Sequence, residues 1–301
     1  MSKKAPGAKP DWSVTAKDRD AFVALIWERS ALHYRDLPWR NIGDAYGVLV
    51  SEVMLQQTQV ARVMRYWQHW MDLFPTVDAL AAADTSLVLE TWQGLGYNRR
   101  ALALKRACET CSAQFGGTLP RTVDELASLP GIGPATAAGI VAFAYNQPSV
   151  YIETNVRSVF LHELFPEREK VSDKELFPYV KDTCPPAHAD VAPEHSPRAW
   201  YYALLDYGAH LKTQVANPSR RSAHHARQSK FEGSRREKRS FILKQVLAEP
   251  DGISAAEVRV ALDSFERKAG REPIDPALFE AIVQELSAEG FFRLDDGLLI
   301  P

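Results

Sequence analysis

The sequence predicts an all-α protein, and three observations support this prediction. Apolar residues recur at helical spacing along most of the 301 residues, Gly and Pro separate the periodic stretches, and no strand-like alternating run with a hairpin turn precedes residue 240. Thr or Asp stands at several expected helix starts, where a side-chain oxygen can cap free backbone N–H groups. The length is sufficient for two domains, each with its own core.

The expected helices follow one another in chain order. The long periodic stretch at 45–74 is expected to form two helices with a break near Gln56 and Gln57. The other helices that precede the basic part of the chain are expected at 18–35, 77–84, 85–95, 99–115, 122–129, 134–145, 155–165 and 197–211.

The C-terminal segment is expected to combine helices with a short hairpin. Helices are expected at 238–248, 254–265 and 276–290, and the turn Asp295-Asp296-Gly297 between apolar pairs indicates a hairpin. Three helices and a hairpin predict a small winged-helix-like domain. Its third helix and its turn are acidic and repel phosphate, so a role in protein contact or packing is favoured over DNA reading.

The expected organisation has four parts: a flexible tail at 1–13, a helical domain at 14–211, a basic connector at 212–240 and the winged-helix-like domain at 241–301. The basic connector holds nine Lys/Arg and two Glu, a net charge of +7, whereas 241–301 holds six Lys/Arg and twelve Asp/Glu, a net charge of −6. A basic stretch of this density indicates a polyanionic partner, and a solvated linker is the alternative.

The composition is that of an ordinary globular protein, with 46% apolar and 25% charged residues. No apolar run reaches the roughly 18 residues that a membrane span needs, and the N-terminus has no apolar signal segment. Three cysteines cannot form a disulfide framework, so we expect a cytoplasmic protein in a reducing compartment. A monomer without a membrane partner is also expected. Cys108 and Cys111 lie in one expected helix without a second pair, so no metal site is expected.

The segment "LPGIGPATA" at 129–137 predicts a helix, a tight turn and a second helix that begins at Pro134. Gly131 and Gly133 allow the backbone to approach a phosphate closely, and the helix start offers free N–H groups and a positive dipole end. Such a contact positions a protein on the DNA backbone without reading its sequence. Taken alone, the turn could equally serve helix–helix packing.

Neighbouring motifs favour the DNA interpretation because they agree in order and spacing. They are "LPWR" at 37–40, "SEVMLQQTQVARV" at 51–63, "FPTVDALAAA" at 74–83, "GLGYNRRA" at 94–101 and the hairpin at 129–137. Together they resemble the MutY family of adenine DNA glycosylases, in the helix-hairpin-helix superfamily that includes endonuclease III. The resemblance covers about 14–230 and implies a helix-hairpin-helix DNA glycosylase fold. It also implies a nucleoid-associated protein whose partner is double-stranded DNA with a mispair or lesion.

The resemblance assigns the general acid to Glu52. Such an enzyme flips its target nucleotide out of the duplex, protonates the leaving base and stabilises an oxocarbenium-like sugar with negative charge. An acid must stay protonated near neutral pH, and the apolar neighbours Val53, Met54 and Leu55 are consistent with a pocket that raises its pKa. The alternative is a charge at a helix N-terminus or a member of a surface ion pair.

The resemblance also places residues around the flipped base. Gln56, Gln57 and Tyr97 match residues that wedge into the base stack, although a buried tyrosine of the core is the simpler interpretation of Tyr97. Trp39 is expected either to stack in the base pocket or to belong to the core.

The stretch from Tyr151 to Arg157 matches the family's catalytic segment at every position except the acid. Glu153 stands where the family has Asp, so a carboxylate remains at a helix start, one methylene further from the backbone. Asn155 and Arg157 complete the match as a catalytic and a DNA-binding residue. A misplacement of about 1 Å can cost on the order of 100-fold in rate, so either the backbone retreats or the chemistry differs.

Ala135 stands where bifunctional relatives carry the lysine that attacks the sugar. The resemblance therefore implies a monofunctional glycosylase without lyase activity. Ala135 also lines the expected base pocket and lacks the hydroxyl that family members often carry there.

A second departure concerns the iron–sulfur cluster that most family members hold. The four ligand positions read Lys212, Ser219, Ser222 and Gln228, none of which is a thiolate, so no cofactor is expected and the chain resembles a clusterless branch. The basic connector is expected to contact phosphate instead, through Arg220, Arg221, Arg227, Lys230, Arg235 and Arg236.

The sequence thus predicts a DNA repair glycosylase that hydrolyses the N-glycosidic bond of a flipped base, with adenine in a mispair as the expected substrate. One alternative is a glycosylase for mispaired thymine or uracil, or for a modified purine. The other is a DNA-binding protein that has kept the fold and lost catalysis.

Overall fold

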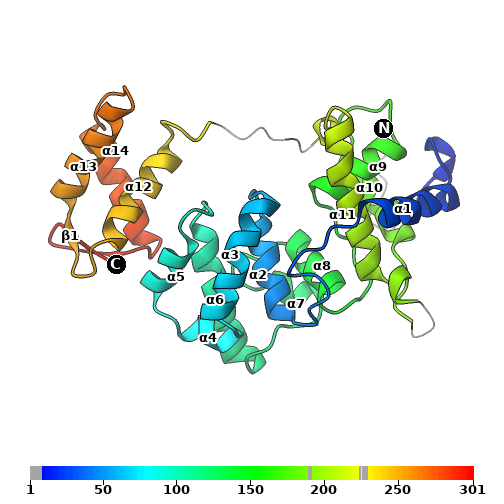
Figure 1. Cartoon of the computed structure of the whole chain (residues 1–301), viewed down its shortest axis with the longest axis horizontal. Coiled ribbons are helices and arrows are strands. Elements are labelled where there is room, and N and C mark those ends of the chain that lie inside the picture. The colour runs from blue at the N-terminus through cyan, green and yellow to red at the C-terminus, as the bar shows by residue number, and fades with distance from the viewer. Residues whose placement is uncertain (1–8, 189–191, 224, 226–229) are drawn as a thin grey trace. The chain divides into compact units, whose positions relative to one another are not determined.

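The computed structural model describes residues 9–188, 192–223, 225 and 230–301, and most of its regular structure is helical (Figure 1). The predicted all-α class is therefore confirmed. The chain divides into two compact units, each assembled from segments that are distant in sequence. The first unit takes segments 1–52, 119–128 and 132–227, and the second takes 53–118, 129–131 and 228–301.

The regular elements described in the first unit are helices. It contains η1 (Trp12–Val14), α1 (Arg19–His33), most of α2 (Ala45–Leu55), α7 (Val123–Ala127), α8 (Pro134–Phe143), α9 (Thr154–Glu163), α10 (Asp173–Thr183), η2 (Pro193–His195), α11 (Pro197–Gln214) and η3 (Pro218–Arg221).

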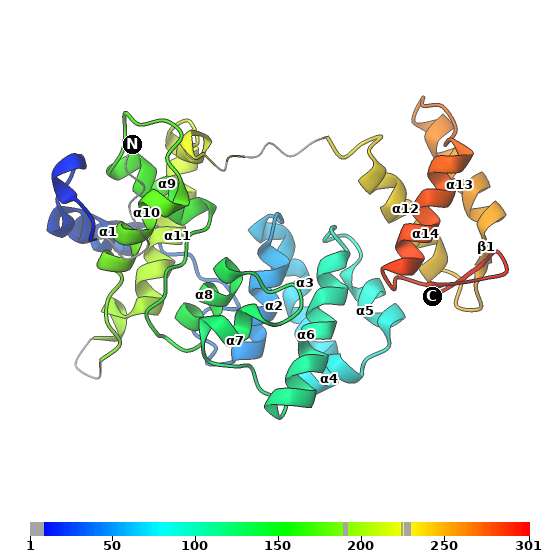
Figure 2. The ribbon, with the colours of Figure 1, turned by 180° about the vertical axis from the view of Figure 1, so that it is seen from behind.

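Helix α11 forms the centre of the first unit. It begins sharply because the Ser196 hydroxyl accepts a hydrogen bond from the Ala199 N–H and Pro197 occupies the first helical position. Its buried residues, among them Trp200 and Leu204, pack against α1, α8 and α9. Figures 1 and 2 both show α9, α10 and α11 side by side. Helix α11 thereby fixes the position of α9, which carries part of the candidate site.

A buried charge cluster joins α11 to the segment that precedes α2. The Asp206 carboxylate accepts hydrogen bonds from both terminal nitrogens of Arg40 at 2.7 Å and from Arg35 Nε at 2.6 Å. The side chains of Arg40 and Asp206 are each 1% exposed, and the Arg40 guanidinium also lies over the Tyr202 ring, 4.3 Å from its centroid. Two buried charges stabilise a fold only when they are well paired. The two-pronged pairing of Arg40 with Asp206 meets this condition and fixes the 35–40 segment on α11.

The second unit combines helices from the middle of the chain with the C-terminal residues. It contains α3 (Val60–Leu73), α4 (Val77–Ala82), α5 (Thr85–Trp92), α6 (Arg99–Phe115), α12 (Arg235–Leu247), β1 (Ile253–Ser254), α13 (Ala255–Lys268), α14 (Pro276–Ala288), β2 (Arg293–Asp295) and β3 (Leu298–Ile300).

The C-terminal elements have the order helix, strand, helix, helix, strand, strand, which is that of a winged helix. The three strands form one antiparallel sheet in the order β1-β3-β2, with Leu299 opposite both Ile253 and Leu294. The sequence analysis missed β1. With two residues it is too short for an alternating pattern, and only its pairing with β3 defines it.

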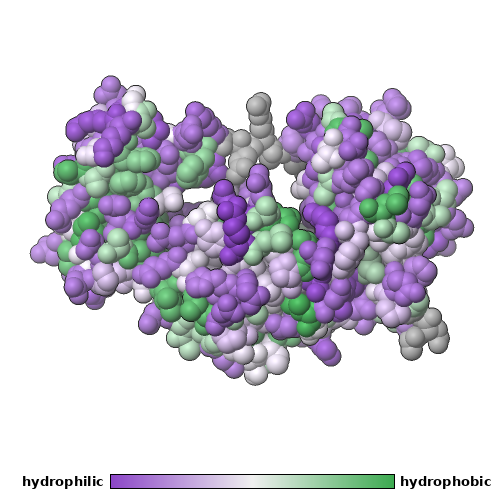
Figure 3. Space-filling model, in the orientation of Figure 1, coloured by the Kyte–Doolittle hydropathy of each residue, from purple (hydrophilic) through white to green (hydrophobic). Residues whose placement is uncertain are grey.

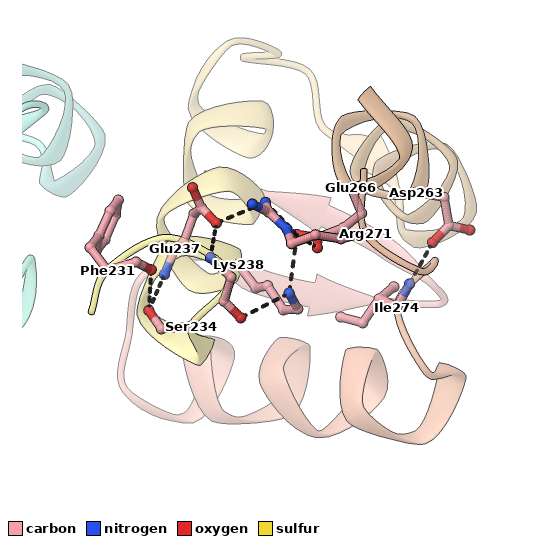
Figure 4. Close-up of polar contacts among 9 residues, drawn as sticks. Phe231, Ser234, Glu237, Lys238, Asp263, Glu266, Arg271 and Ile274 are labelled. Carbon is pink, nitrogen blue, oxygen red and sulfur yellow. Dashed lines mark hydrogen bonds and ion pairs between the residues drawn. The ribbon is translucent and has the colours of Figure 1, made fainter. Parts of the chain in front are cut away.

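A buried glutamate connects α12 to α13 in this domain (Figure 4). Glu266 is 1% exposed and accepts contacts from Lys238 Nζ at 3.0 Å and Arg271 Nε at 2.6 Å. Arg271 also pairs with Glu237 at 2.9 Å. The end of the basic connector is therefore paired within the winged-helix domain, and part of its positive charge serves folding.

The sequence analysis also missed helix α10. Pro178 lies inside this helix, and a proline that removes a backbone donor is read from sequence as a helix breaker. The signal that marks the helix is its capping box, in which the Ser172 hydroxyl accepts from the Glu175 N–H while the Glu175 carboxylate accepts from the Ser172 N–H.

The two compact units do not follow the order of the chain, and the four-part organisation expected from the sequence stays a prediction. Residues 53–118 group with the C-terminal segment and not with the remainder of the helical domain. Helix α11 extends to Gln214 and α12 begins at Arg235, so both ends of the basic connector are helical. Between them Ser222 forms a bridge with Val171 of the first unit.

Large apolar side chains such as Trp70, Trp92 and Trp200 are fully buried, and hydrophilic residues cover most of the face seen in Figure 3. Among the described residues, the helices are too short or too polar for a membrane span.

Replacing Asp206 with Asn should strongly destabilise the first unit. The substitution leaves the Arg40 guanidinium buried without its counter-charge, which costs about 3–5 kcal/mol in comparable cases. Urea unfolding should show this loss, whereas Asp20→Asn, at a side chain 92% exposed, should change the free energy of unfolding by less than about 0.5 kcal/mol. Equal effects of the two substitutions would contradict the assigned role of the buried pair.

Candidate active site

Glu52 lies near the end of α2 and faces α8. The rest of the protein covers the residue in part. Gly139 of α8 makes room for it, because an added Cβ would lie 2.5 Å from Glu52 Oε2 and 2.8 Å from the Tyr151 ring. The Tyr151 hydroxyl donates a hydrogen bond to Glu52 Oε2 at 3.2 Å. The carboxyl is therefore held between a glycine and a buried tyrosine.

The protein around Glu52 makes it an acid suited to neutral pH. Desolvation raises the pKa of Glu52 from 4.5 to about 8, the Tyr151 hydrogen bond opposes this shift, and the negative charge of Glu153 adds to it. Burial also raises the pKa of the Tyr151 hydroxyl well above its ordinary value, so Tyr151 acts as a neutral donor. At pH 7 Glu52 accordingly holds a proton that it can donate.

Glu153 is the N-cap of α9. Its Oε1 accepts hydrogen bonds from the backbone N–H groups of Asn155 at 2.6 Å and Val156 at 3.2 Å. The extended backbone at Glu153, with φ −110° and ψ −177°, lets the longer side chain fold back onto the helix start. Within the described part of the chain no hydrogen bond reaches its Oε2. One oxygen thus anchors the residue, and the other can face a positively charged substrate.

Asn155 and Arg157 continue along α9. The Asn155 Oδ1 accepts a hydrogen bond from Lys212 Nζ at 2.6 Å. Arg157 forms a two-pronged pair with Asp173 of α10, with Nε–Oδ1 at 2.6 Å and Nη2–Oδ2 at 2.7 Å. Arg157 therefore links α9 to α10, and its expected DNA contact stays a prediction.

The hairpin between α7 and α8 has the geometry that its glycines predict. Gly131 has φ +74°, and an added Cβ would lie 2.5 Å from the Ala103 Cβ, so only glycine fits. Gly133 is the N-cap of α8 and Pro134 its first residue. Ala135 follows on the exposed start of α8. Gly133 has no side chain with which to cap the start of α8, and a helix start of this kind suits an anion.

The expected wedge residues lie in the second unit on two loops that Arg100 holds together. The Arg100 guanidinium donates to the carbonyl oxygens of Gln56 on one loop and Gly96 on the other, and to that of Val53 in the last turn of α2. Burial lowers its pKa to about 10.

Two of the wedge residues occupy strained backbone positions on these loops. Gln57 has φ +56° and Tyr97 φ +50°, a region that residues other than glycine rarely adopt. Arg236 donates to the Tyr97 hydroxyl at 2.5 Å, so a predicted wedge residue and a predicted phosphate contact meet directly.

Trp39 is buried at 5% exposure, which favours its core alternative over base stacking.

The remaining candidates of the basic connector differ in their surroundings. Arg220 is exposed, and no described residue forms a hydrogen bond with its side chain. Arg221 instead donates to the carbonyl oxygens of Leu161 and Phe165 at the end of α9. Lys230 pairs with Glu232 and Arg235 with Glu285. Arg227 lies outside the described residues.

The positions expected for an iron–sulfur cluster do not fit one. Lys212 binds Asn155, Ser219 and Ser222 are buried in the η3 turn, and Gln228 lies outside the described residues. None of these side chains carries a thiolate. The three cysteines lie elsewhere, two of them buried on α6, and the described residues contain no cluster of His, Cys, Asp or Glu that could hold a metal ion.

Comparison with known proteins supports a DNA repair assignment. The sequence model of the HhH-GPD superfamily of base excision DNA repair proteins matches residues 50–186. An adenine DNA glycosylase of Mycobacterium tuberculosis H37Rv is 34% identical over 211 residues, 69% of this chain and 67% of the relative. The enzyme of that name from Mycolicibacterium smegmatis is 46% identical over 126 residues, 42% of this chain and 43% of the relative. The human one is 42% identical over 134 residues, 42% of this chain and 24% of the relative.

Two solved structures share the fold at low sequence identity. A thermostable thymine-DNA glycosylase has a TM-score of 0.54 and 22% identity, covering 64% of this chain and 86% of its own. An endonuclease III trapped covalently on DNA has a TM-score of 0.50 and 19% identity, covering 64% of this chain and 84% of its own. Fold and site thus define a base excision repair protein of the DNA glycosylase class. The chain belongs to the HhH-GPD superfamily, as its motifs predicted.

The structure adds site residues that the sequence analysis missed as functional. In the sequence Tyr151 begins a matched segment, Gly139 lies inside an expected helix, and Lys212 stands at the first cluster-ligand position, so none of the three is predicted to act at the site. Glycine inside a buried helix is a signal for close approach, and it could have indicated Gly139. No local pattern indicates the other two, since their partners lie 99 and 57 residues away.

Glu52→Gln should increase the free energy of unfolding relative to the native protein, and this gain should grow as the pH rises. The folded-state pKa of Glu52 is about 8 against 4.5 ordinarily, so between these values the folded state retains a proton that the unfolded state has lost. Raising the pH through this window therefore destabilises the native protein by up to about 1.4 kcal/mol per pH unit at this site. Glutamine cannot ionise and removes the effect.

Urea unfolding at pH 5, 6, 7 and 8 measures this difference. The exposed Glu90→Gln serves as the control, because its carboxylate is already in water. A constant difference between Glu52→Gln and the native protein across the four pH values would show that Glu52 is not a buried acid.

Proposed function

We propose that the chain is a DNA N-glycosylase that removes adenine from mispairs in duplex DNA and leaves an abasic site. The observation that carries this proposal is Glu52, a carboxyl group that desolvation keeps protonated at neutral pH and that the Tyr151 hydroxyl contacts. Adenine is supported by the adenine DNA glycosylase that is 34% identical over 211 residues.

In the proposed reaction Glu52 donates its proton to N7 of the flipped adenine. The N-glycosidic bond then breaks with its electron pair moving to the base, and C1′ of the sugar becomes positively charged. The carboxylate of Glu153, anchored at the start of α9 through Oε1, stabilises this charge. Water adds to C1′, and the proton that it releases restores Glu52. Two carboxyl groups with different surroundings thus divide the acid and anion roles.

The same proposal includes the means of DNA binding. The hairpin start of α8 and the exposed Arg220 would contact phosphates, and Gln56, Gln57 and Tyr97 would enter the base stack. Ala135 carries no amine, so the reaction would stop at hydrolysis without cleaving the sugar. We propose a monomer that acts on nucleoid DNA in the cytoplasm and needs no metal or cofactor.

A second candidate is removal of another base. The longer acid at Glu153 and the small residue at Ala135 depart from the pattern that the resemblance implies, and both favour an altered base pocket. Mispaired thymine or uracil, or a modified purine, is the substrate class of this candidate.

A panel of duplexes with single mispairs, treated with alkali after incubation, should show strand breaks only where adenine was mispaired. Glu52→Gln should lower the single-turnover rate by at least about 100-fold because the proton donor is lost. Its DNA affinity should stay within a few-fold, since Glu52 contacts no phosphate. Borohydride should trap no protein on DNA.

The outcomes of this panel separate the candidates. Breaks at thymine, uracil or a modified purine would select the second candidate, and a covalent complex would contradict hydrolysis without lyase activity. Binding without release of any base would leave a DNA-binding protein.

Arg220→Ala should weaken binding to every duplex and reduce the salt slope of affinity by about one unit, as the loss of one phosphate contact does. Arg221→Ala is the matched comparison one residue away. Arg221 binds carbonyl oxygens at the end of α9, so its removal should lower the melting temperature and change the salt slope of affinity little. An effect of Arg220→Ala on one base sequence alone would argue against a phosphate contact.

A further inference from the structure

Helix α11 meets the start of α9 through two residues on one face. Gly208 and Lys212 are four positions apart, so they lie one turn from each other on the same side of α11. An added Cβ at Gly208 would lie 2.4 Å from the backbone oxygen of Asn155 and 2.8 Å from its Cβ. Lys212 Nζ donates to Asn155 Oδ1 at 2.6 Å. The glycine permits the close approach, and the lysine binds the side chain that it reaches.

Asn155 connects Lys212 to the candidate catalytic carboxylate through two separate hydrogen bonds. Asn155 accepts from Lys212 through its side chain, and its backbone N–H donates to Glu153 Oε1 at 2.6 Å. A shift of Asn155 as a whole therefore moves the backbone N–H that holds Glu153 Oε1. Lys212 reaches this anchor from a different helix, so it restrains the start of α9 relative to α11.

The surroundings of Lys212 are costly for an ammonium group. The side chain is half-buried, and this desolvation lowers its pKa below the ordinary value. The negative charge of Glu153 opposes the shift, while the positive charges of Arg157 and Arg35 add to it. An apolar side chain of similar length would avoid this cost. A lysine at this place is thus poorly explained by stability alone.

The neighbouring turn is held by separate contacts. Asn217 accepts from the Ser219 N–H and from the Ser158 hydroxyl, and Arg221 binds the end of α9. The attachment of η3 to α9 therefore does not require Lys212. This independence makes it possible to change Lys212 without releasing the turn.

We propose that Lys212 is a positioning residue for catalysis: it holds Asn155 and thereby sets the carboxylate of Glu153 against the substrate. The inference rests on the proposed glycosylase function and deepens it. Lys212 stands at the first position where the resemblance implies a cluster cysteine. In this role it links α11 directly to the start of α9. Lys212 itself does not touch the substrate.

Lys212→Met should lower the single-turnover rate of base release by about 10–100-fold, the loss expected when a catalytic group shifts by about 1 Å. Affinity for the substrate duplex should stay within a few-fold of the native value, and the salt slope of that affinity should stay within about half a unit. The melting temperature should not fall, since the substitution removes a half-buried charge. Lys212→Arg should restore part of the rate because it retains a donor. The exposed Lys181→Met is the control and should retain the native rate.

A double-substitution cycle tests the route through Asn155. If Lys212 acts by holding Asn155, the rate of Lys212→Met/Asn155→Ala should match that of Asn155→Ala alone, because the second change removes an interaction already lost. Multiplied losses in the double variant would overturn the proposal. A native rate for Lys212→Met would overturn it as well, and so would a rate loss explained by a fall in affinity with a flatter salt slope.

The native protein is assayed first on the mispair panel, and this separates the two proposals. If it releases no base from any duplex, the proposed function fails and the role of Lys212 in catalysis fails with it. If it releases a base and Lys212→Met does so at the native rate, only the positioning proposal fails.

Discussion

The approach of α11 to the start of α9 is the constraint on which the candidate site depends. Gly208 has no side chain, and the Asn155 backbone occupies the space that a Cβ would take. Asp206, two residues earlier on α11, is buried against Arg40 and so fixes the chain that leads into α2. One helix therefore positions both the carboxylate at the start of α9 and the segment before Glu52.

The two candidate catalytic carboxyl groups owe their roles to opposite surroundings. Glu52 lies between Gly139 and Tyr151, where desolvation opposes ionisation and raises its pKa to about 8. Glu153 lies at a helix start, where two N–H groups and the helix dipole favour an anion. The extra methylene of Glu153 does not displace this cap, because the extended backbone directs the side chain back to the same N–H groups. The same carboxyl side chain can thus serve as an acid at one position and as an anion at the other.

The basic connector shows why charge in a sequence is a weak guide to partners. Lys238 and Arg239 pair with glutamates of the winged-helix domain, Arg235 pairs with Glu285, and Arg221 binds the end of α9. Much of the excess positive charge is therefore balanced within the protein by residues that lie far away in sequence. A net charge of +7 over 212–240 overstates the charge that is available to DNA. Among the connector residues that the structure describes, Arg220 is the clearest remaining candidate.

The helical class, the hairpin at Gly131 and the superfamily could be predicted from the sequence, because periodicity, turn residues and short motifs are local features. Glu52 was indicated by its match to a motif, and Glu153 by its position in a motif that otherwise has Asp there. The sequence did not reveal α10, where Pro178 concealed a helix that tertiary packing and a capping box support. The contact of Tyr151 with Glu52, the contact of Lys212 with Asn155 and the grouping of the middle of the chain with its end could be seen only in the folded protein. The reason is physical: burial, pKa and hydrogen-bond partners depend on which distant segments meet, and that follows from packing the whole chain.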